Sequence, residues 1–361
     1  MAWTKARPAF EGNDRSGAAS PLKVLVTGGT GSFGQAFVRR LLAEHRDCTI
    51  RVFSRDELKQ YDMAQAFGQD PRLRFFIGDV RDRDRLERAM YGIDLVVHAA
   101  ALKHVPICEF NPAEAVKTNI LGSQNVVDAA VDAGVRRTVA LSTDKAVNPV
   151  NLYGASKLCA EKLFVHGNAY AGARDIRFAC VRYGNVMGSR GSVIPLFQRQ
   201  ADSGVLTITD RRMTRFWLSL DSAVDLVLHA VSEMKGGEIF VPKIPSMRIA
   251  DLARAIGPNA RIEEVGRRPG EKLHEVLLTA EESRNTIECD HHYIVRPDGG
   301  SVPENTVAGR ALPDGFAYAS DTNTEWMSVE ELRAFVARFC ASEARKQQQG
   351  FPQPTAASGN S

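Results

Sequence analysis

From residue 23 onward, short apolar runs alternate with segments whose apolar residues recur every three or four positions. The runs are rich in valine and isoleucine and predict strands, and the longer segments predict helices. The predicted strands are 23–27, 49–53, 73–77, 94–98, 137–141 and 176–182, and the predicted helices are 33–44, 57–67, 83–90, 112–132, 152–170 and 221–233. Because strands and helices alternate and the strands are continuously apolar, the sequence predicts a Rossmann-like, doubly wound parallel α/β sheet covered on both faces.

The regular alternation ends after Tyr183. A glycine-rich loop follows, and beyond Gly237 the pattern changes to short strands, short helices and basic loops. We therefore expect a smaller α/β substrate-binding domain that closes over the carboxyl edge of the sheet. The predicted organisation is a disordered tail at 1–20, a dinucleotide-binding domain of 21–182 and 217–245, a smaller domain of 183–216 and 246–342, and a disordered tail at 343–361.

Composition narrows the class of protein. Hydrophobic residues make up 44% and charged residues 25% of the 361 residues, which is typical of a globular protein. The net charge of +3 is too small to indicate a nucleic-acid or membrane-surface partner. The six cysteines are scattered, without metal-ligand spacing, and no apolar window is long enough to span a membrane. We expect a cytoplasmic protein with free thiols, no metal and no secretion signal.

A glycine-rich turn joins the first predicted strand to the first predicted helix. Residues 27–34 read Thr-Gly-Gly-Thr-Gly-Ser-Phe-Gly. Glycines in such a turn let the backbone approach a pyrophosphate, which then lies at the helix N-terminus. A plain strand-to-helix turn is the alternative, but the flanking strand and helix favour a dinucleotide site. The residues expected to contact the cofactor here are Gly28, Thr30, Gly31, Ser32, Phe33 and Gly34.

The tip of the second strand bears on the choice of cofactor. An acidic residue at this position pairs with ribose hydroxyls and favours NAD, whereas arginine accommodates the 2′-phosphate of NADP. Arg55, helped by Ser54 and Lys59, favours NADP. In the alternative, Asp56 binds the ribose and Arg55 is a solvated charge.

Two further strand ends complete the predicted cofactor site. Asp79 and Val80 follow the third strand and are expected beside the adenine. Ala99, Ala100 and Ala101 follow the fourth, where small residues let the nicotinamide half lie against the backbone. Lys103 and His104 come next, and either could reach the active site or lie at its rim.

The candidate chemistry is concentrated between residues 141 and 157. Tyr153 and Lys157 are four residues apart on a predicted helix, so they share a face. A nearby ammonium group favours the phenolate, which makes tyrosine a better base. Thr143, Asp144 and Lys145 lie just past a strand end, where α/β sheets place their chemistry. The plainer alternative is an Asp144–Lys145 pair that only fixes a loop.

Together these features resemble the extended short-chain dehydrogenase/reductases, over roughly residues 22–340. Asn119 belongs to the same pattern, and the resemblance implies that it supports the cofactor site. The Thr-Asp-Lys order and the tyrosine at 153 resemble the inverting UDP-N-acetylglucosamine 4,6-dehydratases of pseudaminic acid synthesis; dTDP-glucose dehydratases carry Thr-Asp-Glu instead. The blocks that share this resemblance are 54–60, 77–82, 98–106, 182–186, 188–193, 213–217, 237–246, 268–275 and 314–321.

The resemblance implies oxidation of the sugar at C4, loss of water across C5 and C6, and return of the hydride to C6, with inversion at C5. It implies an NADP-dependent hydro-lyase acting on UDP-N-acetylglucosamine to give UDP-2-acetamido-2,6-dideoxy-β-L-arabino-hex-4-ulose. In this hypothesis Tyr153 is the base at O4, and Lys157 lowers its pKa and holds the ribose. Thr143 bonds near O4, Lys145 is the base at C5, and Asp144 protonates the leaving hydroxyl.

The resemblance also implies a set of substrate-binding residues, with Asn185 and Arg268 at the diphosphate and Glu271 at the uridine ribose. Arg267 adjoins Arg268, so the two could exchange roles. The full predicted set is Lys103, Tyr183, Asn185, Arg190, Val193, Arg215, Arg268 and Glu271.

Two other functions remain open from sequence alone. A UDP-sugar 4-epimerase would need Tyr153 and Lys157, with Asp144 and Lys145 incidental. A non-catalytic NADP-binding sensor would need neither pair for turnover. The resemblance further implies a homo-oligomer, with a hexamer among the options.

Overall fold

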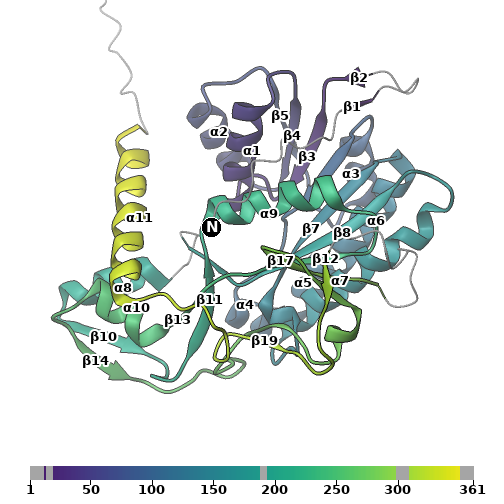
Figure 1. The fold of residues 1–361 in the computed structure, drawn as a ribbon. Coiled ribbons are helices and arrows are strands. Elements are labelled where there is room, and N and C mark those ends of the chain that lie inside the picture. The colour runs from purple at the N-terminus through teal and green to yellow at the C-terminus, as the bar shows by residue number, and fades with distance from the viewer. Residues whose placement is uncertain (1–11, 14–18, 188–192, 298–308, 350–361) are drawn as a thin grey trace, which may run out of the picture.

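The computed structural model describes residues 12–13, 19–187, 193–297 and 309–349. Its centre is a ten-stranded sheet in the order β18-β16-β17-β12-β8-β7-β6-β3-β4-β5 (Figure 1). Seven neighbouring strands are parallel. They are β3 (Lys23–Thr27), β4 (Thr49–Ser54), β5 (Leu73–Ile77), β6 (Leu95–His98), β7 (Arg137–Thr143), β8 (Arg177–Tyr183) and β12 (Ile239–Pro242). The predicted Rossmann-like class is confirmed.

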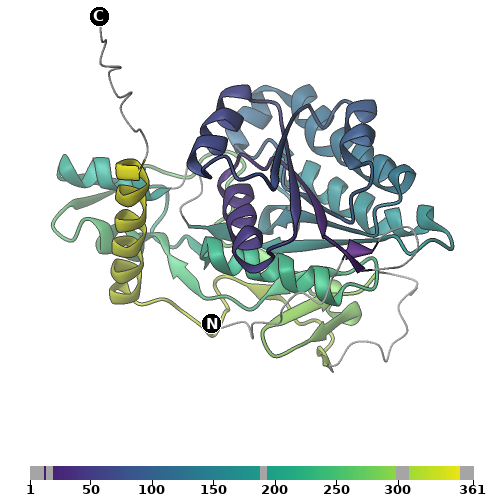
Figure 2. The same ribbon diagram turned by 90° about the horizontal axis from the view of Figure 1, so that it is seen from above.

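Helices cover both faces of this sheet, as the end-on view shows (Figure 2). On one face α3, α6 and α7 pack in series, and on the other α1 packs against α9. Their buried sides form one large apolar core with the strands. The bounds are α1 (Ser32–Glu44), α2 (Glu57–Ala66), α3 (Arg83–Met90), α6 (Gly122–Ala133), α7 (Leu152–Ala171) and α9 (Leu220–Glu233). All but α6 lie close to their predicted ranges.

The segment predicted as one helix at 112–132 has three parts. A short α5 (Pro112–Ala115) leads into a π-helical turn, η1 (Val116–Leu121), before α6 begins. The amide of Asn119, on η1, bonds both backbone groups of Leu102 and the hydroxyl of Ser156. These bonds hold the wide turn against the loop after β6, which periodicity alone does not indicate. A further helix, α4 (Val105–Phe110), was not predicted.

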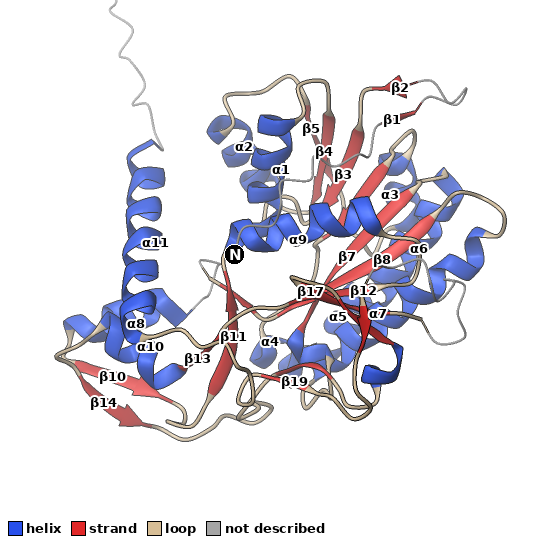
Figure 3. Cartoon of the chain, in the orientation of Figure 1, coloured by secondary structure: helices blue, strands red, loops and turns tan. Residues whose placement is uncertain are grey.

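A second apolar core lies beside the sheet and is built from the later chain (Figure 3). Its elements are α8 (Val193–Asp202), β10 (Val205–Ile208), β11 (Thr214–Leu218), β13 (Ser246–Arg248), α10 (Ile249–Ile256), β14 (Arg261–Glu264) and α11 (Val329–Gln349). Strand β11 pairs with β9 (Asn185–Val186) and β13, and β10 pairs with β14. This core corresponds to the smaller domain.

The structure differs from the predicted boundaries in three places. Strands β16 (Thr286–Glu288), β17 (His292–Val295) and β18 (Arg310–Ala311) extend the large sheet in antiparallel fashion, although they fall in the range predicted for the smaller domain. Helix α11 continues to Gln349, past the predicted start of the tail. Within the first predicted tail, β1 (Gly12–Asn13) pairs with β2 (Ala19–Ser20).

The last elements connect the two cores. Strand β15 (Val276–Leu278) pairs with β19 (Tyr318–Ala319), and a 3₁₀ turn, η3 (Glu282–Asn285), precedes β16. In the described ranges, none of the helices has both the length and the apolar character needed to cross a membrane. Groups of three or more metal-ligating side chains are also absent from those ranges.

Candidate active site

The turn after β7 brings the predicted catalytic residues together. Strand β7 ends at Thr143 and continues as a 3₁₀ turn, η2 (Asp144–Ala146). Asn151 caps the N-terminus of α7, because its side chain accepts a hydrogen bond from the Gly154 backbone N–H at 2.8 Å. A Cβ on Gly154 would lie 2.1 Å from the Lys145 carbonyl oxygen. Glycine is therefore required at this position for the first turn of α7 to pack against η2.

Polar contacts fix the centre of this turn. The Thr143 hydroxyl and the Lys145 ammonium both donate to Asp144 Oδ1, each at 2.9 Å. Lys145 Nζ also lies 3.4 Å from Asn185 Oδ1 on β9. Asp144 has no exposed surface, and its Oδ2 lacks a hydrogen-bond partner within the described part of the chain. A buried, incompletely paired carboxylate is costly for stability, which favours a functional role over a loop-fixing one.

A cavity of about 650 Å³ opens at the carboxyl ends of the parallel strands, where α/β folds bind ligands. Thr143, Lys145, Tyr153 and Lys157 line it together with nearly all of the predicted cofactor residues. The latter are Gly28, Thr30, Gly31, Ser32, Phe33, Gly34, Ser54, Arg55, Lys59, Asp79, Val80, Ala99, Ala100, Ala101 and Lys103. Asn119 and Asp144 are buried behind this wall instead.

The glycine turn has the close packing that the predicted motif requires. Gly28 has a φ of +65°, and a Cβ there would lie 2.8 Å from the Ala100 backbone nitrogen. A Cβ on Gly34 would lie 2.4 Å from the Gly29 carbonyl oxygen. These contacts bring α1 tightly onto the strand ends and leave its N-terminus facing the cavity, which suits a pyrophosphate.

At the far end of the cavity, two basic and two acidic side chains lie together: Arg55, Lys59, Asp56 and Asp79. The Asp56 carboxylate accepts the Lys59 backbone N–H at 3.0 Å and caps α2, and it is also ion-paired with the Lys59 ammonium. Asp79 is bonded by Arg81 at 2.7 Å and lies 3.5 Å from Arg55. Because both carboxylates already have cationic partners, the Arg55 guanidinium at the rim is well placed for a phosphate.

The charge of Lys145 acts on the Tyr153 phenol. Burial raises the pKa of Tyr153 to about 12, opposed by the charge of Lys145 and by a hydrogen bond with Thr143. Lys157 is buried, which lowers its own pKa. Lys145 thus favours the Tyr153 phenolate in the described structure, and the effect of Lys157 on Tyr153 stays a prediction.

Lys145 is held as an ammonium ion. Burial favours its neutral form, but the carboxylates of Asp144 and Glu275 outweigh this effect and raise the pKa of Lys145. Lys103, also on the cavity wall, has a lowered pKa because of burial and the nearby Lys145 charge. The cavity wall therefore carries Lys145, which is held as an ammonium ion by two carboxylates, and Lys103, which loses its proton more easily.

The predicted substrate residues divide into groups. Tyr183 and Asn185 line the cavity, whereas Val193, Arg268 and Glu271 lie outside it, and Arg190 falls outside the described residues. Arg215 does not face the cavity: its guanidinium donates to the carbonyl oxygens of Thr214, Leu273 and Lys272. These bonds make Arg215 a support for the 272–275 segment, and its predicted part in substrate binding stays a prediction.

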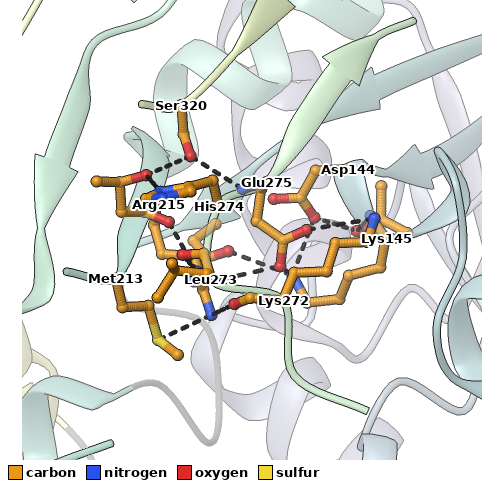
Figure 4. Close-up of polar contacts among 12 residues, drawn as sticks. Asp144, Lys145, Met213, Arg215, Lys272, Leu273, His274, Glu275 and Ser320 are labelled. Carbon is orange, nitrogen blue, oxygen red and sulfur yellow. Dashed lines mark hydrogen bonds and ion pairs between the residues drawn. The ribbon is translucent and has the colours of Figure 1, made fainter. Parts of the chain in front are cut away.

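Sequence reasoning missed Glu275 and Lys272. Figure 4 shows Glu275 pointing into the space between Lys145, Arg215 and Lys272, with Asp144 beside it. The ion-pair distances from the Glu275 carboxylate are 3.5 Å to Lys145, 3.8 Å to Arg215 and 3.7 Å to Lys272. Glu275 lies in the 268–275 block of the sequence, but nothing in its spacing indicated a contact with residue 145.

Comparisons with known proteins agree with this arrangement. Residues 24–297 match the family model described as "Polysaccharide biosynthesis protein". The "UDP-N-acetylglucosamine 4,6-dehydratase (inverting)" of Campylobacter jejuni serotype O:2 is 51% identical, over 86% of this chain and 95% of the relative. The "UDP-glucose 4-epimerase" of Rickettsia canadensis is 46% identical, over 86% and 94%.

Solved structures show the same fold. "Pen" from Bacillus thuringiensis superposes with a TM-score of 0.81 at 39% identity, over 88% of this chain and 99% of that one. DesIV, a dTDP-glucose 4,6-dehydratase of Streptomyces venezuelae with NAD and TYD bound, gives 0.61 at 28% identity, over 70% and 87%.

Proposed function

Because the chain belongs to the polysaccharide biosynthesis protein family, we propose that it is an inverting UDP-N-acetylglucosamine 4,6-dehydratase. The observation that carries this proposal is the placement of Lys145, paired with Asp144, on the same cavity wall as Tyr153 and Lys157. A redox pair alone suffices for oxidation at C4, whereas a second acid–base pair is needed to eliminate water. The product would be the 4-keto-6-deoxy sugar nucleotide inverted at C5, which supplies pseudaminic acid synthesis.

We propose NADP as the cofactor, supported by the position of Arg55 on the cavity wall and by the engagement of Asp56 as the cap of α2. A bound nicotinamide dinucleotide would take the hydride from C4 and return it to C6. Tyr153 would take the O4 proton, and Lys157 would bind the nicotinamide ribose. The positive charge of Lys145 and the Thr143 hydroxyl both assist ionisation of Tyr153.

In the proposed elimination, the Lys145 ammonium first passes a proton to the Asp144 carboxylate 2.9 Å away. The resulting neutral amine then takes the C5 proton, which the C4 ketone has made acidic. The C5–H electron pair moves toward the C4 carbonyl and then forms the C5–C6 double bond as the C6–O bond breaks. The departing hydroxyl takes a proton and leaves as water. This step ends with an Asp144 carboxylate beside a Lys145 ammonium, which is the ion pair present at 2.9 Å.

The leaving-group proton needs a route, because Asp144 has no exposed surface. The Thr143 hydroxyl is bonded to Asp144 Oδ1 and also lines the cavity. We propose that protonated Asp144 gives its proton to Thr143 Oγ1 while Thr143 passes its own proton to the leaving oxygen. Inversion requires C5 to be reprotonated on the opposite face, so that donor is a group other than Lys145.

For the substrate, we propose that Tyr183 and Asn185 contact the sugar. We propose that Arg268, with Arg267 beside it, and Glu271 bind the UDP portion. The support is the position of Asn185 within hydrogen-bonding distance of Lys145. We propose that Lys103, which lines the cavity, lies between the cofactor and the sugar. The sequence placed it among both the cofactor-binding and the substrate-binding residues.

We also propose a cytoplasmic homo-oligomer. All six cysteines are unpaired, which fits a reducing compartment. Exposed apolar side chains gather on α4 and η1, at Ile107, Phe110 and Leu121, and these suit burial against a second copy. A hexamer is the arrangement expected from the resemblance, and sedimentation velocity measures the assembly directly.

A UDP-sugar 4-epimerase is the second candidate, because relatives of that name are 46% identical. Incubation of the protein with UDP-N-acetylglucosamine in deuterated water separates the two reactions. We expect a 4-keto-6-deoxy product with deuterium at C5 and the inverted C5 configuration by NMR. UDP-N-acetylgalactosamine as the only product would establish the epimerase, and cofactor binding without any turnover would establish the sensor.

A further inference from the structure

Glu275 is a deeply buried carboxylate outside the predicted site, and it contacts the side chain of Lys145. It is 2% exposed and lies between the 268–274 loop and β15, which begins at Val276. Ser320 fixes its backbone, because the Glu275 N–H donates to Ser320 Oγ at 2.9 Å. Ser320 is in turn bonded to the Thr214 hydroxyl at 2.6 Å. The backbone at Glu275 is thus held by β11 and by the segment after β19.

The side chain of Glu275 collects three cations. Its Oε1 lies 3.5 Å from Lys145 Nζ and 3.8 Å from Arg215 Nε, and its Oε2 lies 3.7 Å from Lys272 Nζ. Oε2 has no hydrogen-bond partner among the described residues. A buried carboxylate surrounded by cations at ion-pair distance, with an incompletely satisfied oxygen, is a poor choice for stability alone.

The same segment is attached to the catalytic turn at two further points. Lys272 Nζ donates to the Val147 carbonyl oxygen, and the Gly270 carbonyl oxygen accepts the Asn151 amide at 2.8 Å. Arg215 donates to the carbonyl oxygens of Leu273 and Lys272. Residues 270–275 therefore form a bridge between β11 of the smaller domain and the turn that carries Lys145, and Glu275 is the point at which this bridge meets the lysine.

We propose that Glu275 is a positioning residue for Lys145, which fixes its Nζ and its charge for proton transfer at C5. This inference rests on the proposed function and names a residue that lies outside the catalytic turn and outside the predicted set of site residues. Glu275 does not line the cavity, so it acts through Lys145 and not on the sugar. Its physical effect is twofold: it limits where Nζ can lie, and it stabilises the ammonium that forms when Lys145 accepts the C5 proton.

The charges around Lys145 give the direction of the expected change. Asp144 comes from η2, Glu275 from the bridge and Arg215 from β11, while Tyr153 on α7 and the Lys103 and Lys272 ammonium groups complete the surroundings. Removing the Glu275 charge leaves one carboxylate among several cations. The pKa of Lys145 then falls, so the limb of the pH–rate profile that reports its deprotonation moves to lower pH.

The test compares Glu275→Gln with the wild type and with Glu281→Gln, which removes an equal charge from an exposed position nearby. For Glu275→Gln we expect kcat about ten- to hundredfold lower with KM nearly unchanged, as for a misplaced catalytic group. We also expect the acid limb of the profile to shift to lower pH. Reduced nicotinamide should accumulate in a single turnover, because oxidation at C4 proceeds while loss of the C5 proton is slowed. Glu281→Gln should match the wild type.

Glu275→Asp separates charge from reach and guards against a folding defect. It keeps the carboxylate but shortens the side chain, so we expect a wild-type pH limb with a lower kcat. Wild-type kcat and pH profile in Glu275→Gln would overturn the inference. A folded Glu275→Gln enzyme that loses activity without a pH shift and without accumulation of reduced nicotinamide would also overturn it. If Glu275→Gln does not fold, wild-type kinetics in Glu275→Asp would overturn it. Failure of the proposed function appears separately, as absence of dehydration by the wild type.

Discussion

Asp144 and Lys145 are neighbours in the sequence, yet the fold gives them different surroundings. Asp144 is fully buried behind the cavity wall, whereas Lys145 lies on that wall. The residue that connects the buried acid to the cavity is Thr143, whose hydroxyl bonds Asp144 and also assists Tyr153. At the scale of single residues, the Thr143 hydroxyl therefore contacts both the buried acid and the phenol.

Replacing Thr143 with valine tests the role of this hydroxyl. Valine keeps the shape but removes the hydroxyl, so the leaving oxygen loses its proton source and we expect dehydration to slow about a hundredfold or more. Binding of NADP, measured by fluorescence titration, should stay unchanged. Thr143→Ser keeps the hydroxyl and should retain most of the rate. A Thr143→Val enzyme as fast as the wild type would show that Asp144 reaches the substrate by another route.

At the scale of elements, strand tips and helix starts set the chemistry. Asp56 caps α2, so the carboxylate that sequence alone left as a ribose ligand is committed to the helix start. Strand β4 then presents Ser54 and Arg55 to the cavity. One helix cap thereby bears on cofactor choice, because it leaves arginine as the side chain with reach toward a 2′-phosphate.

Arg55→Ala should therefore discriminate between the two cofactors. Loss of the guanidinium removes one charge-assisted contact, so the Kd for NADP should rise about tenfold or more. The Kd for NAD should stay nearly unchanged. Isothermal titration of both dinucleotides measures the ratio. Arg88→Ala, on the exposed side of α3, is the matched control. An equal loss for NAD and NADP would place Arg55 away from the 2′ position.

The elements with strong periodicity could be predicted from sequence, and the contacts between distant segments could not. Strand β5 and helix α3 match their predicted bounds because apolar spacing and turn residues are local signals. The π-helical turn depends on Asn119 bonding Leu102 and Ser156, which lie far from it in the chain. The contact of Glu275 with Lys145 and the inward position of Arg215 depend on the 270–275 bridge, so the sequence did not indicate them. The position of Thr143 and Lys145 at the cavity could be predicted, because both follow the end of a strand.

At the scale of the whole molecule, buried histidines make stability depend on pH. His98 is 1% exposed and bonded to Thr27 at 2.8 Å, and burial, together with the charge of Lys157, lowers its pKa to about 3. Burial and neighbouring histidines lower the pKa of His292 to about 3 as well. Both are neutral in the folded state at pH values where an unfolded histidine, with a pKa near 6.5, would be protonated.

Stability should therefore fall as pH decreases from about 6.5 toward 3, by about 1.4 kcal/mol per pH unit for each such histidine. Above about 6.5 the two groups contribute no slope. Urea unfolding at a series of pH values measures this, and His98→Asn should reduce the slope by one histidine's share, whatever its effect on stability at neutral pH. His166→Asn, at an exposed position, should leave the slope unchanged. An unaltered slope in His98→Asn would contradict the assignment.

The position of β12 in the large sheet has a consequence for biosynthesis. Its inner neighbour β8 is made before it, but its outer neighbour β17 is more than forty residues further along the chain. While the ribosome is still adding those residues, the apolar strand Ile239–Pro242 is an unprotected sheet edge, open to pairing with another nascent chain. Chains that end before β17 should therefore aggregate through this edge, so that translation through Val295 becomes a condition for recovering soluble protein.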